Sequence, residues 1–443
     1  MIKKLSILLL VLIMVANVAF AKNVTLTIAT VNNPDMKIME ALSSQFTKET
    51  GIELNWVILP ENELRQKITE DVALGAGKFD IVTIGIIEVK NWVNYGWIAP
   101  LDPFFTDMDT AEKKAYDLDD VLQSVREGLS AKGQLYALPF YGETSITYYR
   151  KDLFEKAGLT MPEEPSWSQI LEFATKLHDP DNGFYGLCLR GLPGWGENMA
   201  VFGTMINAFG GRWYDMDWNA QFDTPEMKNA FEFYNTLIKE VSEPGATGVG
   251  FTEGLTLMAQ GKAGIWYDAS VGAGLLNDPS QSKVVGKLGY ARAPYAKKHN
   301  NGWLWSWSLA MESASKHKKE AFKFLTWFTS KDYINLVGET KGWVNAPSGS
   351  RKSTYENPKY QKVADFAPLV LSAMKAVDYN HPSILPTPYI GTPFVVFPEW
   401  PHLGSEVAQQ LAATIAGKKT IDEALKACQK IANEVAEEGG YKH

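Results

Sequence analysis

The sequence predicts an α/β protein built from doubly wound sheets with helices on their faces. Three observations predict this class: short apolar runs typical of strands, amphipathic runs typical of helices, and their regular alternation along the first part of the chain. The chain has 443 residues, a length that usually divides into about two or three domains. We expect mostly parallel strand pairing, with ligands bound at the carboxyl ends of the strands.

The first strand and the first helix are predicted near the start of the chain. Residues 24–29 alternate between apolar and polar side chains, as a half-buried strand does. Asn33 and Pro34 are typical of a helix start, residues 36–50 form an amphipathic run, and Gly51 is suited to end the helix.

A second strand, a second helix and a third strand follow in the same pattern. We predict a strand at residues 52–57, a helix at 63–74, and a buried strand at 80–84 that ends at Gly85. This βαβαβ order is the starting unit of a doubly wound sheet.

Polar side chains lie just past the carboxyl ends of these strands. They are Asn32, Asn33, Asp35 and Glu88. Side chains at this edge of a sheet can reach a ligand, although helix capping or contact with solvent would explain the same residue types. They are candidate ligand contacts.

The first residues have the pattern of a signal peptide. Lys3 and Lys4 precede an apolar stretch at 5–18, and Ala19-Phe20-Ala21 is an A-x-A cleavage site. We expect residues 1–21 to be removed after Ala21 and the product to work in a Gram-negative periplasm. No later stretch approaches the roughly 20 apolar residues that span a membrane. The residue after the cleavage site is Lys22, and not the Cys that would carry the lipid of a lipoprotein.

The composition is acidic, with 43 basic and 51 acidic residues and a formal net charge of −8. Loss of the leader would remove two lysines and no acid, which makes the mature chain more acidic. Nucleic acids and anionic membranes favour basic patches, so neither is expected as a partner. The six histidines are scattered without metal-ligand spacing. We therefore expect no metal and no cofactor. We also expect the protein to be a monomer.

The two cysteines, Cys188 and Cys428, could pair in an oxidising compartment. Cys428, however, falls on the apolar face of a C-terminal helix, where such residues are usually small buried hydrophobes. We favour two free thiols.

Several segments in order along the chain resemble one protein family. They are YRKDLFEKAGL at 149–159, SWSQ at 166–169, LMAQGKAGIW at 257–266, SKHKKEAFKFL at 315–325 and GKKTIDEAL at 417–425. With these motifs the chain resembles the extracellular solute-binding proteins of ABC sugar importers. The matches cover nearly the whole chain that remains after the leader.

The resemblance implies a two-lobed periplasmic-binding-protein fold, in which a solute is enclosed in the cleft as the lobes close on crossing hinge strands. By comparison with the family, the N-terminal lobe would hold residues 22–138 and 308–342. The C-terminal lobe would hold 139–307 and 343–443.

Three tryptophans two residues apart, Trp303, Trp305 and Trp307, are predicted on one face of a strand. An aromatic core or a subunit contact would explain them as well as a binding wall. The resemblance places them on a crossing strand at the floor of the cleft. We expect Trp303 to contact solute, Trp305 to share the wall, and Trp307 to pack beneath it.

A sugar or polyol site needs flat aromatic faces for C–H groups and polar side chains for hydroxyls. Loops and strand ends of this chain carry both kinds. The remaining candidate ligand contacts are Glu143, Trp195, Asp268, Trp343, Asn345 and Trp400. Trp213, in a similar loop, could equally cover an edge of the second lobe.

Segments such as 31–35, 83–85 and 141–145 look most like the sorbitol- and mannitol-binding subgroup. We expect a sugar alcohol as solute and ABC permease subunits as partner. A mono- or oligosaccharide, a peptide, or a secreted carbohydrate-active enzyme with paired carboxylates are the alternatives. The chain lacks the H-E-x-x-H, G-x-S-x-G and P-loop motifs, so we expect no catalytic activity.

Overall fold

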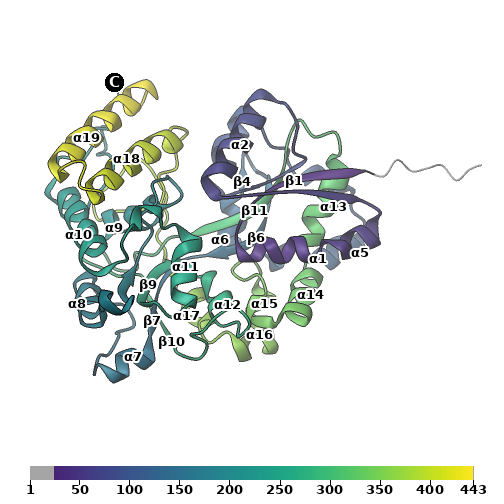
Figure 1. The fold of residues 1–443 in the computed structure, drawn as a ribbon. Helices are drawn as coiled ribbons and strands as arrows, with labels where there is room; N and C mark the ends of the chain where they lie inside the picture. Colours follow the sequence, from purple (N-terminus) through teal and green to yellow (C-terminus); the bar gives the residue numbers. More distant parts are fainter. Residues whose placement is uncertain (1–23, 443) are drawn as a thin grey trace, which may run out of the picture.

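The protein consists of two lobes joined by crossing segments (Figure 1). The structure is a computed structural model that describes residues 24–442, so the predicted signal peptide lies outside the described residues. No helix within this range is both long and apolar enough to cross a membrane.

The first lobe is built on a five-stranded sheet in the order β2-β1-β3-β11-β6. Its strands are β1 (Thr25–Val31), β2 (Glu53–Leu59), β3 (Ile81–Ile84), β6 (Ala137–Glu143) and β11 (Trp305–Met311). The second lobe holds a four-stranded sheet in the order β10-β7-β9-β8. Its strands are β7 (Ser145–Arg150), β8 (Tyr185–Cys188), β9 (Ala263–Ala269) and β10 (Leu288–Arg292). A short hairpin is formed by β4 (Ser130–Ala131) and β5 (Gln134–Leu135).

Helices connect the strands and cover the sheets. Up to β7 they are α1 (Pro34–Thr50), α2 (Glu61–Leu74), α3 (Ile86–Tyr95), α4 (Asp102–Asp107), α5 (Thr110–Tyr116) and α6 (Gln123–Gly128). Between β7 and β11 they are α7 (Lys151–Lys156), α8 (Trp167–Leu177), α9 (Asn198–Ala208), α10 (Pro225–Val241), α11 (Phe251–Ala259) and α12 (Gly272–Leu276). After β11 they are α13 (Lys318–Phe328), α14 (Lys331–Lys341), α15 (Lys352–Glu356), α16 (Pro358–Val363), α17 (Ala367–Ala376), α18 (Trp400–Ile415) and α19 (Ile421–Glu438).

The predicted βαβαβ unit is confirmed. The side chain of Asn33 caps α1 by accepting from the backbone N–H of Met36, and Gly51 ends the helix in the left-handed conformation at φ 73°. β1 pairs in parallel with β2 and with β3. Val31 and Gly85 thus mark one ligand-facing edge of the sheet.

The α/β class is also confirmed, but the sheets are mixed rather than mostly parallel. In the first sheet β11 is antiparallel to both β3 and β6. In the second sheet β7 is antiparallel to β9 and β10, and only β8 and β9 are parallel. The reason is the crossing between lobes: β6 runs towards the second lobe and β11 returns from it, so these neighbours point in opposite directions.

The crossing points follow from the strand limits. β6 pairs within the first sheet through Glu143, and after Thr144 the chain enters β7 of the second sheet. On the return, β11 begins at Trp305, so Trp303 precedes the strand instead of lying on it. These changes of sheet fall a few residues from the predicted limits 138/139 and 307/308.

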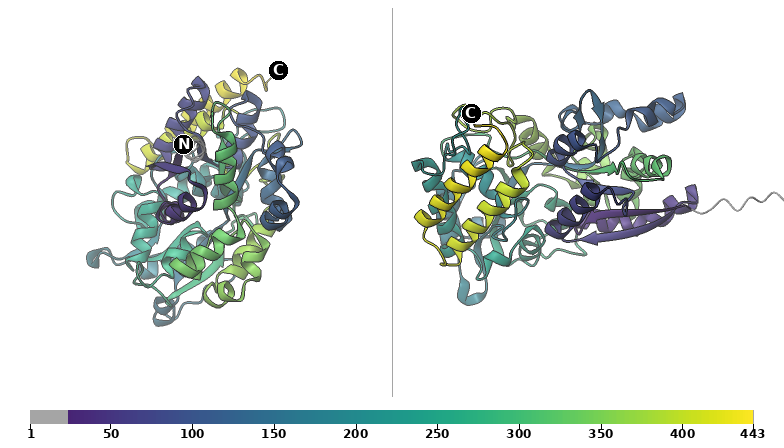
Figure 2. Two further views of the ribbon diagram at one scale, coloured as in Figure 1. Left: turned by 90° about the vertical axis from the view of Figure 1, so that its right-hand side faces the viewer. Right: turned by 90° about the horizontal axis from the view of Figure 1, so that it is seen from above.

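The two ends of the described chain lie on different lobes. β1 begins in the first lobe, whereas α18 and α19 pack side by side on the second (Figures 1 and 2). Both cysteines are buried and free, and Cys428 lies on the buried face of α19 as predicted.

Candidate functional site

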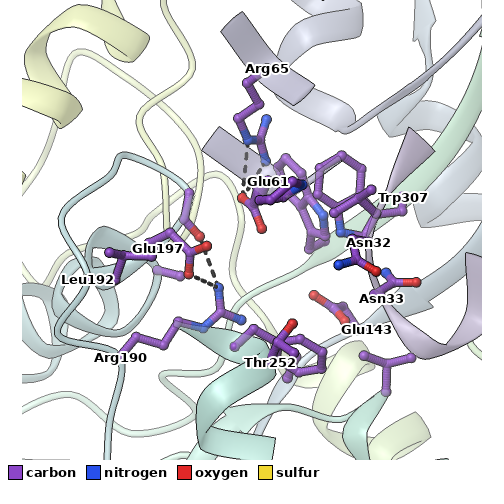
Figure 3. A pocket seen from close by; sticks show the side chains of 18 of the residues that line it. Asn32, Asn33, Glu61, Arg65, Glu143, Arg190, Leu192, Glu197, Thr252 and Trp307 are labelled. Carbon is purple, nitrogen blue, oxygen red and sulfur yellow. Dashed lines mark hydrogen bonds and ion pairs between the residues drawn. The ribbon is translucent and has the colours of Figure 1, made fainter. Parts of the chain in front are cut away.

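A cavity of about 160 Å³ lies between the two lobes, at the point where the chain crosses from one to the other. This volume is below the range of about 300–1,000 Å³ that is usual for drug-sized ligands and suits one small solute. Its polar and aromatic lining residues include Asn32, Asn33, Glu61, Arg65, Tyr141, Glu143, Arg190, Glu197, Phe251, Thr252, Glu253, Trp303, Trp305, Trp307 and Phe394 (Figure 3).

Glu143 stands at the crossing, as the last residue of β6. It is 5% exposed, and among the described residues its Oε2 has no hydrogen-bond partner. Burial raises the pKa of this carboxyl well above its usual range, against the opposing charge of Arg190. A solute hydroxyl in the cavity would provide the missing partner.

Arg65 enters the cavity from α2 of the first lobe. Its guanidinium donates to Glu61 at 3.0 and 3.1 Å and also to Glu88. The guanidinium carbon lies 3.7 Å from the ring centroid of Trp195, which belongs to the second lobe. The two acids fix the arginine, and the stacking joins it to the opposite lobe. Burial raises the pKa of Glu88, with Arg65 opposing the shift.

Arg190 enters from the second lobe, just after β8. It forms a bidentate pair with Asp268, at 2.9 Å from Nε and 2.6 Å from Nη2, and donates to the carbonyl of Gly196 at 3.0 Å. Glu197 lies 3.7 Å from the same guanidinium. Burial alone would lower the pKa of Arg190, but these carboxylates raise it, so the side chain is held in its charged form.

Three indoles form one wall of the cavity. Trp305 and Trp307 share a face of β11 with ring centroids 5.5 Å apart, and Phe394 packs edge-on to Trp305 at 5.4 Å. Trp303 precedes the strand and also lines the cavity. Trp307 therefore belongs to the wall and does not lie beneath it. A Cβ at Gly85 would overlap the indole of Trp305, so this glycine makes room for the ring.

The asparagines after β1 line the same cavity from the first lobe. Asn33 donates to the hydroxyl of Tyr141 at 2.8 Å while its oxygen caps α1. Figure 3 shows the side chains of Asn32 and Asn33 next to Glu143. Two amides and one carboxyl thus face a common space.

Three predicted residues stand directly behind those that line the cavity. Glu88 and Trp195 hold Arg65, and Asp268 holds Arg190. Asp268 is fully buried and does not line the cavity, but it contacts Arg190, which does. They position donors instead of lining the space themselves.

The other four predicted residues lie away from this cavity. Asp35 and Asn345 line a smaller neighbouring hollow, and the amide of Asn345 donates to Asp278 at 2.9 Å. Trp343 packs against Gly338. Trp400 is fully buried and packs edge-on against Trp213 at 4.9 Å, which makes both part of the second lobe's core.

Sequence reasoning missed several lining residues, among them Glu61, Arg65, Tyr141, Arg190, Glu197, Phe251, Thr252 and Phe394. Arg190 carried a signal, because a charged residue directly after a strand, before a glycine-rich loop, is unusual. Arg65 had no such signal in the sequence, because one arginine on an amphipathic helix is indistinguishable from an ordinary solvent-exposed residue.

The site contains the groups that bind an uncharged polyhydroxyl solute. Fixed arginine N–H groups and asparagine amides can donate, carboxylates can accept, and indole faces can cover C–H groups. Within residues 24–442 no group of three His, Cys, Asp or Glu side chains is arranged to hold a metal ion.

Comparisons with known proteins agree with this geometry. Residues 30–334 match the family model described as bacterial extracellular solute-binding protein. A mannitol-binding protein of Pseudomonas aeruginosa is 47% identical over 419 residues, which cover 94% of each chain.

Two solved structures with bound polyols have the same fold. An ABC transporter solute-binding protein from Agrobacterium vitis with D-mannitol is 47% identical, with a TM-score of 0.90 over 94% of this chain and 99% of that one. A solute-binding protein from Agrobacterium radiobacter in complex with ribitol is 26% identical, with a TM-score of 0.81 over 93% and 98%.

Proposed function

The chain belongs to the bacterial extracellular solute-binding protein family, and we propose that its solute is a hexitol such as mannitol. Its relatives are solute-binding proteins of ABC transporters, so the protein is a binding protein and not an enzyme. It captures the polyol between its lobes and delivers it to the permease.

The observation that carries the hexitol proposal is the make-up of the cavity between the lobes. The Oε2 atom of the buried Glu143 has no hydrogen-bond partner among residues 24–442, and the two arginines of the cavity are each already paired with acids. Such a site favours many neutral hydroxyls over an anionic solute. The small volume also opposes an oligosaccharide. The mannitol-binding relatives at 47% identity support the same solute.

The ligand contacts in this proposal are the candidate residues that line the cavity. They are Asn32, Asn33, Glu143, Trp303 and Trp305, joined by Arg65, Arg190 and Trp307. Solute contact with both lobes would favour the closed state, which the inner-membrane permease subunits read.

Export is part of the proposal. Residues 1–21 direct the chain to the periplasm and are cleaved after Ala21, and the mature protein acts as a monomer. N-terminal sequencing of protein from the periplasmic fraction should begin at Lys22. A product that keeps the leader would contradict this part.

Isothermal titration calorimetry and thermal unfolding with a panel of solutes test the solute class. The panel contains mannitol, sorbitol, ribitol, glucose and maltose. A hexitol at about 100 times its Kd should stabilise the native state by about 2.7 kcal/mol, and the sugars should give little. A clear response to glucose or maltose with none to any polyol would reject the hexitol proposal.

A further inference from the structure

A carboxyl oxygen without a hydrogen-bond partner among residues 24–442 lines the cavity. Glu143 is nine-tenths buried or more, and no described residue satisfies its Oε2. Figure 3 shows it pointing into the space between Asn33 and Thr252, with no dashed line reaching it. Burial of such a group is costly unless a partner arrives, so the carboxyl is suited to a donor that the ligand brings.

The arginines of the cavity do not neutralise Glu143. Arg65 contacts two carboxylates and Arg190 contacts two others, so each guanidinium is already outnumbered by acids. The charged residues that line the cavity are the acids Glu61, Glu143, Glu197 and Glu253 and the bases Arg65 and Arg190. The lining thus carries an excess of carboxyl groups.

We propose that the cavity also binds hexitols in which a protonated primary amine replaces one terminal hydroxyl, with the ammonium donating to Glu143. This inference rests on the proposed function, because the rest of the ligand uses the same polyol contacts. A hydrogen bond between an ammonium and a carboxylate is roughly twice as strong as one between neutral groups. Burial makes the charged form of Glu143 costly and so holds its pKa high. The positive charge of the ligand would offset that cost.

The cation must carry N–H groups. A cation stacked on the nearby rings would meet an arginine charge: the guanidinium of Arg65 lies 3.7 Å from the ring centroid of Trp195 and 4.8 Å from that of Trp307. The guanidinium of Arg190 lies 5.9 Å from Trp303. A primary ammonium needs no ring face, because its hydrogen-bond acceptor is Glu143.

Calorimetry on the mature protein at pH 7 tests the inference with three matched ligands: D-mannitol, 1-amino-1-deoxy-D-mannitol and D-mannonate. We expect the amine to bind at least as tightly as mannitol. The anion should bind at least 100-fold more weakly, because the cavity lining carries four acids and two arginines, and both arginines are already paired with carboxylates. Weaker binding of the amine than of mannitol, or equal binding of mannonate and mannitol, would overturn the inference.

The substitution Glu143→Gln keeps the shape and removes the charge. It should weaken binding of the amine at least tenfold more than binding of mannitol. The matched control is Glu312→Gln, the same change at another buried, unpartnered glutamate that does not line the cavity, and it should leave both affinities unchanged.

An amine preference that survives Glu143→Gln would overturn the role of this carboxyl. If that variant binds neither ligand, the affinities of the unmodified protein for mannitol, the amine and mannonate decide whether the inference holds. Failure of the unmodified protein to bind any polyol would instead count against the proposed function, whereas mannitol binding without amine binding counts against this inference alone.

Discussion

At the scale of single residues, the buried glutamates Glu143 and Glu312 both have carboxyl oxygens without a hydrogen-bond partner among the described residues, and their surroundings differ. Glu143 faces a cavity and can obtain a donor from a solute. Glu312, just after β11, is enclosed by the first lobe. Burial raises the pKa of Glu312 to about 9, and the carboxylates of Asp71 and Asp80 add to the shift. It therefore keeps its proton in the folded state at neutral pH.

The substitution Glu312→Gln should alter how stability depends on pH. Between the ordinary value of 4.5 and about 9, the unfolded chain loses this proton while the folded chain keeps it, so wild-type stability falls as pH rises. A glutamine has no proton to lose. The stability of the variant relative to wild type should rise by up to about 4 kcal/mol from pH 5 to pH 8, because each pH unit in this window is worth about 1.4 kcal/mol.

Urea unfolding at both pH values without polyol measures this gain. Glu438→Gln, at an exposed position on α19, is the control. Its free energy of unfolding should differ from wild type by the same small amount at both pH values. A stability difference for Glu312→Gln that does not change with pH would contradict the explanation.

At the scale of elements, the aromatic wall depends on how β3 and β11 meet. Gly85 ends β3 and begins α3, and the Trp305 ring of β11 lies where a side chain would project from it. The two strands pair antiparallel, with Ser308 opposite Ile84. The position of the indole is therefore set by a neighbouring element as well as by its own strand.

The substitution Gly85→Ala should displace the Trp305 ring into the cavity. Gly85 has an extended backbone that alanine can adopt, so the conflict is with the ring alone. We expect mannitol affinity to fall at least tenfold, and stability to fall by about 1–3 kcal/mol. Calorimetry and urea unfolding measure the two effects.

Gly248→Ala is the matched control, because a Cβ there meets no atom within 4 Å. It should leave mannitol affinity unchanged. An unchanged affinity for Gly85→Ala as well would show that the Trp305 ring does not form the wall that the solute contacts.

The elements that the sequence could predict are those with local signals. Asn33, Pro34 and Gly51 determine the limits of α1, and the alternating pattern at residues 24–29 matches β1. Strand direction could not be predicted this way, because apolar periodicity is the same in parallel and antiparallel strands. The direction of β11 follows from its return between lobes, which is a property of the whole chain.

The same limit applies to the site. Glu143 and the tryptophans at 303–307 were predicted because the family resemblance places them on strands that cross between the lobes. Arg65 was not, because its role arises only when α2 of one lobe meets Trp195 of the other. Trp400 was predicted to form a wall of the site because its segment precedes a predicted helix, yet it is the first residue of α18 and is completely buried. Contacts between distant segments leave no local pattern.

At the scale of the whole molecule, the lobes touch each other beside the cavity. Asn62 of α2 donates to the carbonyl of Pro193 at 3.3 Å, and Asn91 of α3 donates to the carbonyl of Phe397 at 3.2 Å. A Cβ at Gly196 of the second lobe would overlap the carboxylate of Glu61 of the first. The lobes can approach this closely because Gly196 has no side chain.

The substitution Gly196→Ala should hold the lobes apart without disturbing either one. We expect mannitol affinity to fall at least tenfold, while the unfolding temperature without polyol stays within about 1 °C of wild type, because a shift of about 1 °C corresponds to roughly 1 kcal/mol in a chain of this size. Thermal unfolding with and without mannitol provides both values. A large loss of stability in the absence of mannitol would show that the glycine serves the fold of its own lobe.

The placement of the chain ends has a practical consequence. Because β1 starts on one lobe and α19 ends on the other, any hinge motion changes the separation of the two ends. Fluorescent proteins fused before β1 and after α19 would convert that change into a difference in energy transfer. The fold therefore offers a genetically encoded polyol sensor whose signal requires no label inside the binding site.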